Sequence, residues 1–206
     1  MFKNLFSVPI FHGKLDNWKK YNRDLLPVCH EVRKETEDMS ELPWNCHVWS
    51  SYAYDDQLFK RPEFQEISRV IAKYVRAYMD KRQWKGEAKM LMTELWVNYQ
   101  EKYQYQEYHD HRERVLSGVY YIDVPDGAPD LIIKTPLKAN FDDLMFESEE
   151  SGEVHKLKIE TGDLVLFPGW LEHGVDANLT DKPRICLLYT SPSPRDNRVS
   201  RMPSSA

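Results

Sequence analysis

The sequence has few cysteines, no strong charge of either sign and no long apolar run. Its three cysteines are odd in number and include no Cys-x-x-Cys pair, which argues against a disulfide framework. The 28 basic and 33 acidic side chains leave a net charge of -5, far from the basic surface that nucleic-acid binding requires. The mean hydropathy is -0.66, and no segment approaches the roughly 20 apolar residues that cross a bilayer. We therefore expect a cytoplasmic protein with neither a nucleic acid nor a membrane as partner.

The first half of the sequence contains helical periodicity instead. Apolar residues recur at three- and four-residue spacing over 15–37, where Pro27 is expected to bend or interrupt the helix. A second amphipathic helix is predicted over 62–78. The aromatic segment 39–54 is typical of an ordered loop or a short edge strand. Together these elements predict a helical support region at 1–88, which the chain enters through an extended arm or strand.

After Gly86 the period changes from helical to alternating, and apolar residues then recur at every second position. Turn residues such as Pro125-Asp126-Gly127 separate the alternating pieces, and the acidic run 142–153 is typical of a solvated loop. Strands are predicted at 91–99, Val115–Val124, Leu131–Lys134, His155–Glu160, Asp163–Phe167 and Arg184–Tyr189. Many short strands after two helices predict a mainly β fold, an antiparallel sandwich or jelly roll backed by helices.

The C-terminal stretch 190–206 contains almost no core-forming residues and several prolines, so it is predicted to be a disordered tail. Its amino-acid sequence resembles the translation of a sequencing-library adapter joined to a truncated transcript. The join could lie as early as Cys186. In that case the tail is a non-native read-through without function, and the native C-terminus is lost after about Ile185.

Three histidines are the candidate metal ligands. His109 and His111 are one residue apart, and alternate positions of a strand point to the same face, so both could bind one ion. His173 follows an apolar strand that stops at Pro168, which places it in or just beyond a turn leading back to the sheet. Each could also be a solvated polar residue at a strand end. Their occurrence together in one sheet-rich region favours a three-ligand metal site with an open side.

Longer strings in the same region carry a specific resemblance. The segment from Asn98 to Tyr121 contains Leu-Ser-Gly-Val-Tyr-Tyr, and the segment from Gly162 to His173 reads Gly-Asp-Leu-Val-Leu-Phe-Pro-Gly-Trp-Leu-Glu-His. With the later Arg184, these motifs resemble the Fe(II)- and 2-oxoglutarate-dependent oxygenases, above all a bacterial and phage subgroup. The resemblance implies a double-stranded β-helix (jelly roll, cupin-like) at 89–189 as the catalytic core. It also implies that the protein uses Fe(II), 2-oxoglutarate and O2, and that it is a hydroxylase.

The resemblance also implies a ligand set. His109 and His173 match the first and last metal-binding histidines of the superfamily, whereas His111 stands where most members place a carboxylate. Three neutral histidines would leave the metal more positive than two histidines and a carboxylate. We favour His111 as the second ligand and keep Glu113 in reserve, since it has the right parity but a less usual spacing. Asp110 has the wrong parity unless a bulge is present.

For the cosubstrate, the resemblance implies that Arg184 holds the distal carboxylate of 2-oxoglutarate, which its planar fork can bind through two nitrogens. Tyr99 and Tyr121 resemble tyrosines of prolyl hydroxylases that donate to the same carboxylate. Tyr99 shares the parity of His109, although an inward aromatic is often only core. Ser117 is a weaker candidate that would shape the pocket.

Two other functions are compatible with the motifs. A three-histidine, cupin-like dioxygenase would use no oxo acid, and a noncatalytic jelly-roll module would use its histidines structurally. Arg184 argues against the first alternative, because a buried guanidinium without a carboxylate partner is costly. The substrate is expected to be a small molecule or a peptide, and the loops contain no signature that identifies it or an oligomeric state.

Overall fold

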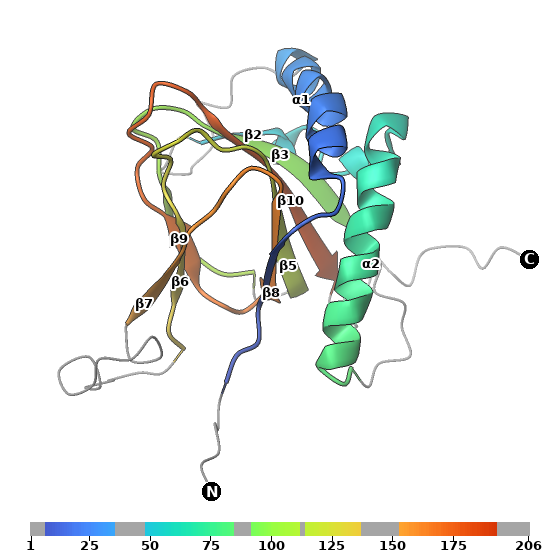
Figure 1. Cartoon of the computed structure of the whole chain (residues 1–206), viewed down its shortest axis with the longest axis vertical. Helices are drawn as coiled ribbons and strands as arrows, with labels where there is room; N and C mark the ends of the chain where they lie inside the picture. The colour runs from blue at the N-terminus through green and yellow to red at the C-terminus, as the bar shows by residue number, and fades with distance from the viewer. Residues whose placement is uncertain (1–6, 36–47, 85–91, 112–113, 137–152, 193–206) are drawn as a thin grey trace, which may run out of the picture.

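The described part of the chain forms two antiparallel sheets and two α-helices (Figure 1). The computed structural model describes residues 7–35, 48–84, 92–111, 114–136 and 153–192. The six-stranded sheet has the order β1-β8-β5-β10-β3-β2 and the four-stranded sheet the order β4-β9-β6-β7. The strands are β1 (Phe11–Lys14), β2 (Trp49–Ser50), β3 (Glu94–Gln100), β4 (Gln106–His109), β5 (Arg114–Asp123), β6 (Leu131–Lys134), β7 (Val154–Leu157), β8 (Asp163–Pro168), β9 (His173–Val175) and β10 (Arg184–Pro192).

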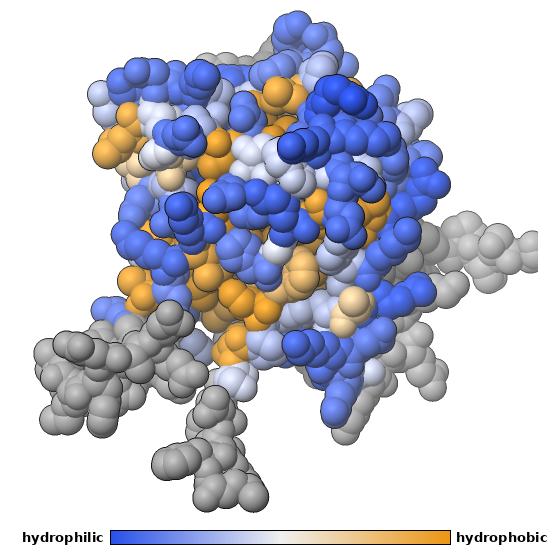
Figure 2. All heavy atoms as spheres, viewed as in Figure 1, coloured by the Kyte–Doolittle hydropathy of each residue, from blue (hydrophilic) through white to orange (hydrophobic). Residues whose placement is uncertain are grey.

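The two helices cover the outer face of the six-stranded sheet (Figure 1). They are α1 (Trp18–Glu35) and α2 (Gln65–Lys81), and α2 follows the short 3-10 turns η1 (Ser51–Ala53), η2 (Leu58–Lys60) and η3 (Pro62–Phe64). Both helices were predicted. Their apolar stripes pack on the sheet because residues three and four apart share one face of a helix. The view in Figure 2 shows a mostly hydrophilic surface over both helices, as expected for their opposite faces.

Helix α1 continues through Pro27, which lies inside it. The sequence had suggested a bend or an interruption at this residue, and an interruption does not occur. Cys29 lies on the buried face of the same helix, and Cys29 and Cys186 are free thiols. No helix in the described ranges is long and apolar enough to span a membrane.

One hydrophobic core lies between the helices and the six-stranded sheet, and a second lies between the two sheets. Strand β5 shows why: Tyr120 and Ile122 face the helices, whereas Val119 and Tyr121 face the other sheet. The four-stranded sheet contributes residues such as Ile133 to this inner layer. The sequence-predicted jelly roll backed by helices is therefore confirmed, and the space between its sheets is where a site can be enclosed.

The strand predictions differ from the structure in several respects, and the strand predicted at His155–Glu160 is β7 at Val154–Leu157. A strand was assumed at His109–His111, but β4 ends at His109 and His111 lies beyond it. Strand β9 was not among the predicted strands, because three residues are too few to show a period. Strand β10 continues through Thr190 to Pro192 and pairs with both β3 and β5, so the prediction of a disordered tail from residue 190 was wrong for 190–192. Thr190 pairs with both neighbouring strands, and Ser191 and Pro192 pair with β5, which keeps this end of β10 in the sheet. The rest of the tail, 193–206, and the acidic residues 142–152 lie outside the described residues.

Candidate metal centre and the adjoining cavity

The register of two short strands brings the first and last candidate histidines together. His109 ends β4 and His173 begins β9, and the two residues are direct partners in the antiparallel pair. The register shifts between Gln106 and His109, which indicates a bulge or irregularity in β4. Across one pair of strands, opposite side chains on the same face lie within contact of each other.

His111 lies just beyond β4, in a turn whose backbone is fixed on both sides. Its N–H donates to the Gly169 carbonyl at 2.6 Å, and its carbonyl accepts from the Arg114 N–H at 2.7 Å. A Cβ on residue 169 would clash with the Arg114 carbonyl and would lie 2.8 Å from the His111 carbonyl oxygen. Glycine is therefore required at 169 for the two turns to approach each other.

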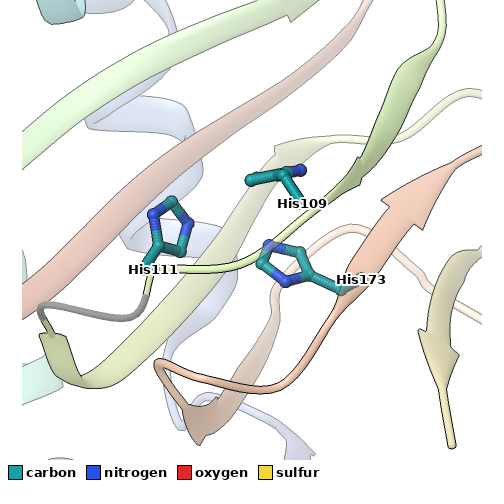
Figure 3. A group of neighbouring side chains, drawn as sticks. All are labelled: His109, His111 and His173. Carbon is teal, nitrogen blue, oxygen red and sulfur yellow. The ribbon is translucent and has the colours of Figure 1, made fainter.

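The three imidazoles converge, as predicted (Figure 3). The ring centroids of His109 and His173 are 4.3 Å apart, and the His111 ring is 5.1 Å from the first and 5.4 Å from the second. One nitrogen from each ring lies within 4.8 Å of the other two, a spacing at which the group could hold a metal ion. Asp110 is not part of this group. Glu113, the reserve ligand, lies outside the described residues.

Burial keeps these rings neutral. Desolvation, with repulsion between the rings as a second cause, lowers the pKa of His173 well below its usual value and the pKa of His111 to about 4. Desolvation also lowers the pKa of His109. Neutral imidazole is the form that binds a metal, so the group is ready to do so at neutral pH.

Backbone carbonyls select the tautomer of two of the rings. The Nδ1 of His109 lies 2.9 Å from the Glu107 carbonyl oxygen, and the Nδ1 of His173 lies 2.9 Å from the Leu171 carbonyl oxygen. A carbonyl can only accept, so each Nδ1 carries the proton and each Nε2 keeps its lone pair. Such a second hydrogen bond also orients a metal-binding ring.

A cavity between the sheets adjoins His109 and His173. Its polar lining consists of Asn98, Gln100, Gln106, Tyr121 and Arg184, together with the two histidines. Arg184 is unusual among them because it is a charged residue and yet only 4% exposed. The Nε and Nη2 of Arg184 have no hydrogen-bond partner among the described residues, while the Tyr121 ring lies under the guanidinium at 4.7 Å.

Arg184 fits an anionic ligand. A buried cation without a negative partner is costly, so its position calls for an anion that the protein itself does not supply within the described residues. The Nε and Nη2 atoms lie on one edge of the guanidinium and together form the two-donor fork that matches a carboxylate. The residues present therefore fit a ligand with a free carboxylate beside the three histidines.

Two of the predicted cosubstrate-binding residues, Tyr121 and Ser117, lie on the inner face of β5. The Tyr121 hydroxyl is buried and makes no hydrogen bond of ordinary geometry within the described residues, and burial raises its pKa. The Ser117 hydroxyl is likewise buried and without a partner in that part of the chain. Ser117 shares the inward parity of Tyr121, although it does not line the cavity itself.

The predicted position of Tyr99 was wrong. Its side chain points toward the helices, where the hydroxyl lies 2.9 Å from the Nδ1 of His30 and the ring packs edge-on against Trp49. Counting parity from His109 back to Tyr99 failed because the two residues lie on strands of different sheets. The turn between these strands includes Tyr103, which has a positive φ of 67° and breaks the alternation.

Sequence reasoning missed the two amides of β3 that line the cavity, Asn98 and Gln100. A signal was present in the alternation of the strand. Asn98 and Gln100 occupy the parity opposite to Val97 and Tyr99, and the latter two belong to the core under the helices. Amides on the inward face of a buried strand are unusual enough to suggest a polar cavity.

The family follows from the segment that builds this site. Residues 94–189, which contain all three histidines and Arg184, match the family described as "Putative 2OG-Fe(II) oxygenase". Residues 94–189 therefore belong to the 2OG-Fe(II) oxygenases, enzymes that use Fe(II), 2-oxoglutarate and O2. The three histidines in this segment fit a metal ion. The resemblance read from the sequence motifs is thereby confirmed. No curated protein matches the oxygenase in sequence.

Solved structures share the fold of this oxygenase at low identity. The α-ketoglutarate-dependent epimerase SnoN from nogalamycin biosynthesis is 13% identical, with a TM-score of 0.65 over 90% of this chain and 77% of SnoN. A prolyl-4-hydroxylase from Pseudomonas putida is 13% identical, with a TM-score of 0.61 over 90% of this chain and 93% of its own. HygX from Streptomyces hygroscopicus, solved with nickel and 2-oxoglutarate, is 9% identical, with a TM-score of 0.61 over 91% and 84%. These similarities establish the double-stranded β-helix.

Proposed function

We propose that this oxygenase is a hydroxylase, that His109, His111 and His173 hold its iron, and that Arg184 binds the distal carboxylate of 2-oxoglutarate. One observation carries the proposal: the buried Arg184, whose Nε and Nη2 have no partner within the described residues, lines the cavity that adjoins two of the three converging histidines. When bound, Fe(II) with 2-oxoglutarate and O2 supplies the oxidising power for C–H oxidation, with release of succinate and carbon dioxide.

Different residues of the protein have different roles in binding and orientation. The neutral imidazoles would offer three nitrogen ligands to Fe(II). Arg184 would hold the distal carboxylate of the oxo acid and so orient it in the cavity beside the histidines. Tyr121 and Ser117 provide buried hydroxyls on the same inner face, and the surrounding apolar core keeps bulk water away.

The assignment as a hydroxylase goes beyond the family. Support comes from the similarity of fold to the prolyl-4-hydroxylase, which is one of several activities found on this fold. SnoN is an epimerase and SnoK a carbocyclase, so oxygenases of similar fold differ in reaction outcome. Hydroxylation is the simplest outcome when a single C–H bond is positioned and no second reacting group is supplied. We further propose that the substrate is a small molecule or a peptide.

The test is a screen of small molecules and peptides for substrate-stimulated, O2-dependent succinate release. Mass spectrometry of the product then decides the reaction type. A hydroxylase adds one oxygen atom, and isotope-labelled O2 delivers the label to the product. Desaturated, cyclised or epimerised products would contradict the hydroxylase assignment while leaving the oxygenase intact. His173→Ala should abolish succinate release, whereas His30→Gln, which removes a histidine on the helix side of the sheet, should not.

The all-histidine ligand group also favours a second candidate, a three-histidine dioxygenase that uses no oxo acid. The two functions differ in one measurement. The second candidate would consume O2 with its substrate in the absence of 2-oxoglutarate, and 2-oxoglutarate would not bind near the metal. The unpaired Arg184 fork favours the first.

A further inference from the structure

The glutamine beside Arg184 is held in one orientation by the backbone. Gln100 is 4% exposed, and its Nε2 donates to the Gln104 carbonyl at 2.9 Å and to the Asp176 carbonyl at 2.8 Å. A primary amide has two N–H groups, so both are used. The amide cannot flip without placing its oxygen against two carbonyl oxygens. Its Oε1 must therefore face the other way, toward Arg184.

This orientation occupies one particular nitrogen of the guanidinium. The Nη1 of Arg184 donates to Gln100 Oε1 at 3.4 Å, a long hydrogen bond, while Nε and Nη2 have no partner within the described ranges. Nε and Nη2 form the edge that binds a carboxylate through two parallel hydrogen bonds. The contact with Gln100 thus uses Nη1 and leaves the two-donor edge of Arg184 without a partner among the described residues, in a side chain that lines the cavity.

The neutrality of Gln100 matters as much as its position. A glutamate or aspartate at this place would compensate the buried charge of Arg184 within the protein, and a ligand carboxylate would gain little by binding. An amide oxygen orients the guanidinium and leaves its charge available. The backbone carbonyl of Gln100 accepts from the Asn178 side chain at 2.9 Å. This hydrogen bond connects the end of β3 to the segment after β9.

We propose that Gln100 is the positioning residue for the cosubstrate: it turns the fork of Arg184 toward the cavity and thereby sets the preference for a dicarboxylic oxo acid. This inference rests on the proposed function of Arg184. It concerns how tightly, and how selectively, 2-oxoglutarate binds, and it assigns Gln100 no contact with the reacting atoms.

The test compares 2-oxoglutarate with 2-oxopentanoate, which keeps the oxo acid and chain length but lacks the distal carboxylate. Both are titrated calorimetrically into Fe(II)-loaded protein under anaerobic conditions. Gln100→Met removes the acceptor at similar volume and should weaken 2-oxoglutarate binding at least about tenfold, the loss expected for a hydrogen bond to a charged group. Binding of 2-oxopentanoate should change less than about twofold, so the ratio of the two affinities falls.

Gln104→Met is the matched control. The Gln104 side chain accepts from the Glu101 N–H at 2.7 Å in the same turn, so its loss perturbs the turn without removing the contact to Arg184. Gln104→Met should keep the wild-type ratio of affinities. Gln100→Glu gives a second measurement if Gln100→Met does not fold: a carboxylate beside Arg184 should lower the ratio further.

The outcomes separate the two proposals. If wild-type protein binds 2-oxoglutarate no better than 2-oxopentanoate, the proposed role of Arg184 fails and the inference fails with it. If wild-type protein discriminates and Gln100→Met keeps the same ratio, or if Gln104→Met loses it equally, only the inference is overturned. A parallel loss of both oxo acids in Gln100→Met also overturns it, because that result would show a purely structural role.

Discussion

His109 and His173 face each other across β4 and β9 as a directly opposed pair, with ring centroids 4.3 Å apart. The backbone carbonyls of Glu107 and Leu171 orient both rings by accepting from Nδ1. Strand pairing therefore fixes two of the three candidate ligands, whereas His111 depends on a turn. This difference makes the identity of the middle ligand the first question for mutagenesis.

We predict that His111, and not Glu113, is the middle ligand. His111→Gln should weaken Fe(II) binding by at least about tenfold, a loss at the lower end of that seen when a metal site is perturbed. His111→Asp should retain binding, because a carboxylate is also a ligand for Fe(II) and adds a favourable charge. Glu113→Gln should bind Fe(II) as wild type does. Equilibrium titration of Fe(II) under anaerobic conditions measures all three variants, and loss of binding in Glu113→Gln with retention in His111→Gln would reverse the assignment.

A second prediction concerns the two tyrosines. Tyr121→Phe removes a buried hydroxyl at the cavity and should weaken 2-oxoglutarate binding about three- to tenfold, as expected for one hydrogen bond. Tyr99→Phe removes only the contact with His30 and should leave that affinity unchanged, while lowering the free energy of unfolding by about 1 kcal/mol. Binding titrations and chemical denaturation check the two effects. Weaker cosubstrate binding in Tyr99→Phe would contradict the placement of this side chain.

Removing the buried charge of Arg184 should have opposite effects on binding and on stability. Arg184→Met should weaken 2-oxoglutarate binding by about thirtyfold or more, since the ligand carboxylate would lose its charged partner. Without 2-oxoglutarate, the same variant should be at least as stable as wild type, because an uncompensated buried charge is replaced by an apolar side chain. Thermal denaturation with and without 2-oxoglutarate measures both. A variant that is much less stable in the absence of the oxo acid would show that Arg184 has a structural role.

The lowered pKa values of the histidines predict how the stability of the metal-free protein depends on pH. In the unfolded chain the imidazoles titrate near pH 6.5, whereas in the folded protein the pKa of His111 is about 4 and those of His109 and His173 are also lowered. Below pH 6.5 the unfolded state binds more protons, so the free energy of unfolding falls as the pH falls toward 4. His111→Gln should show a shallower fall over this window in urea denaturation. An unchanged slope would mean that His111 is not neutral in the folded protein.

Much of this architecture could be predicted because the decisive patterns were local. Strand β6 at Leu131–Lys134 was predicted with its observed bounds, and both helices were predicted, because their apolar residues repeat at the period of the element. The convergence of His109 and His173 could be anticipated from the order of motifs. The strand register that produces it could not, because β4 and β9 have only four and three residues and are too short to show a period.

The errors arose where a local rule was carried across a turn. Tyr99 was placed by parity counted through the turn at Tyr103, where the positive φ ends the alternation. The role of Gln100 could not be read from the sequence either, because the backbone groups that orient it come from the following turn and from the segment after β9. The extension of β10 to Pro192 depends on pairing with β5, and with β3 as far as Thr190, whereas its composition alone is typical of disorder.

The central claim is that three converging imidazoles and the fork of Arg184 together hold iron and 2-oxoglutarate. Its most direct test is the visible absorption spectrum of the wild-type protein during anaerobic addition of Fe(II) and then 2-oxoglutarate. We predict a metal-to-ligand charge-transfer band that saturates at one oxo acid per chain and is absent from His173→Ala. No band in the wild-type protein, or the same band in His173→Ala, would contradict the account.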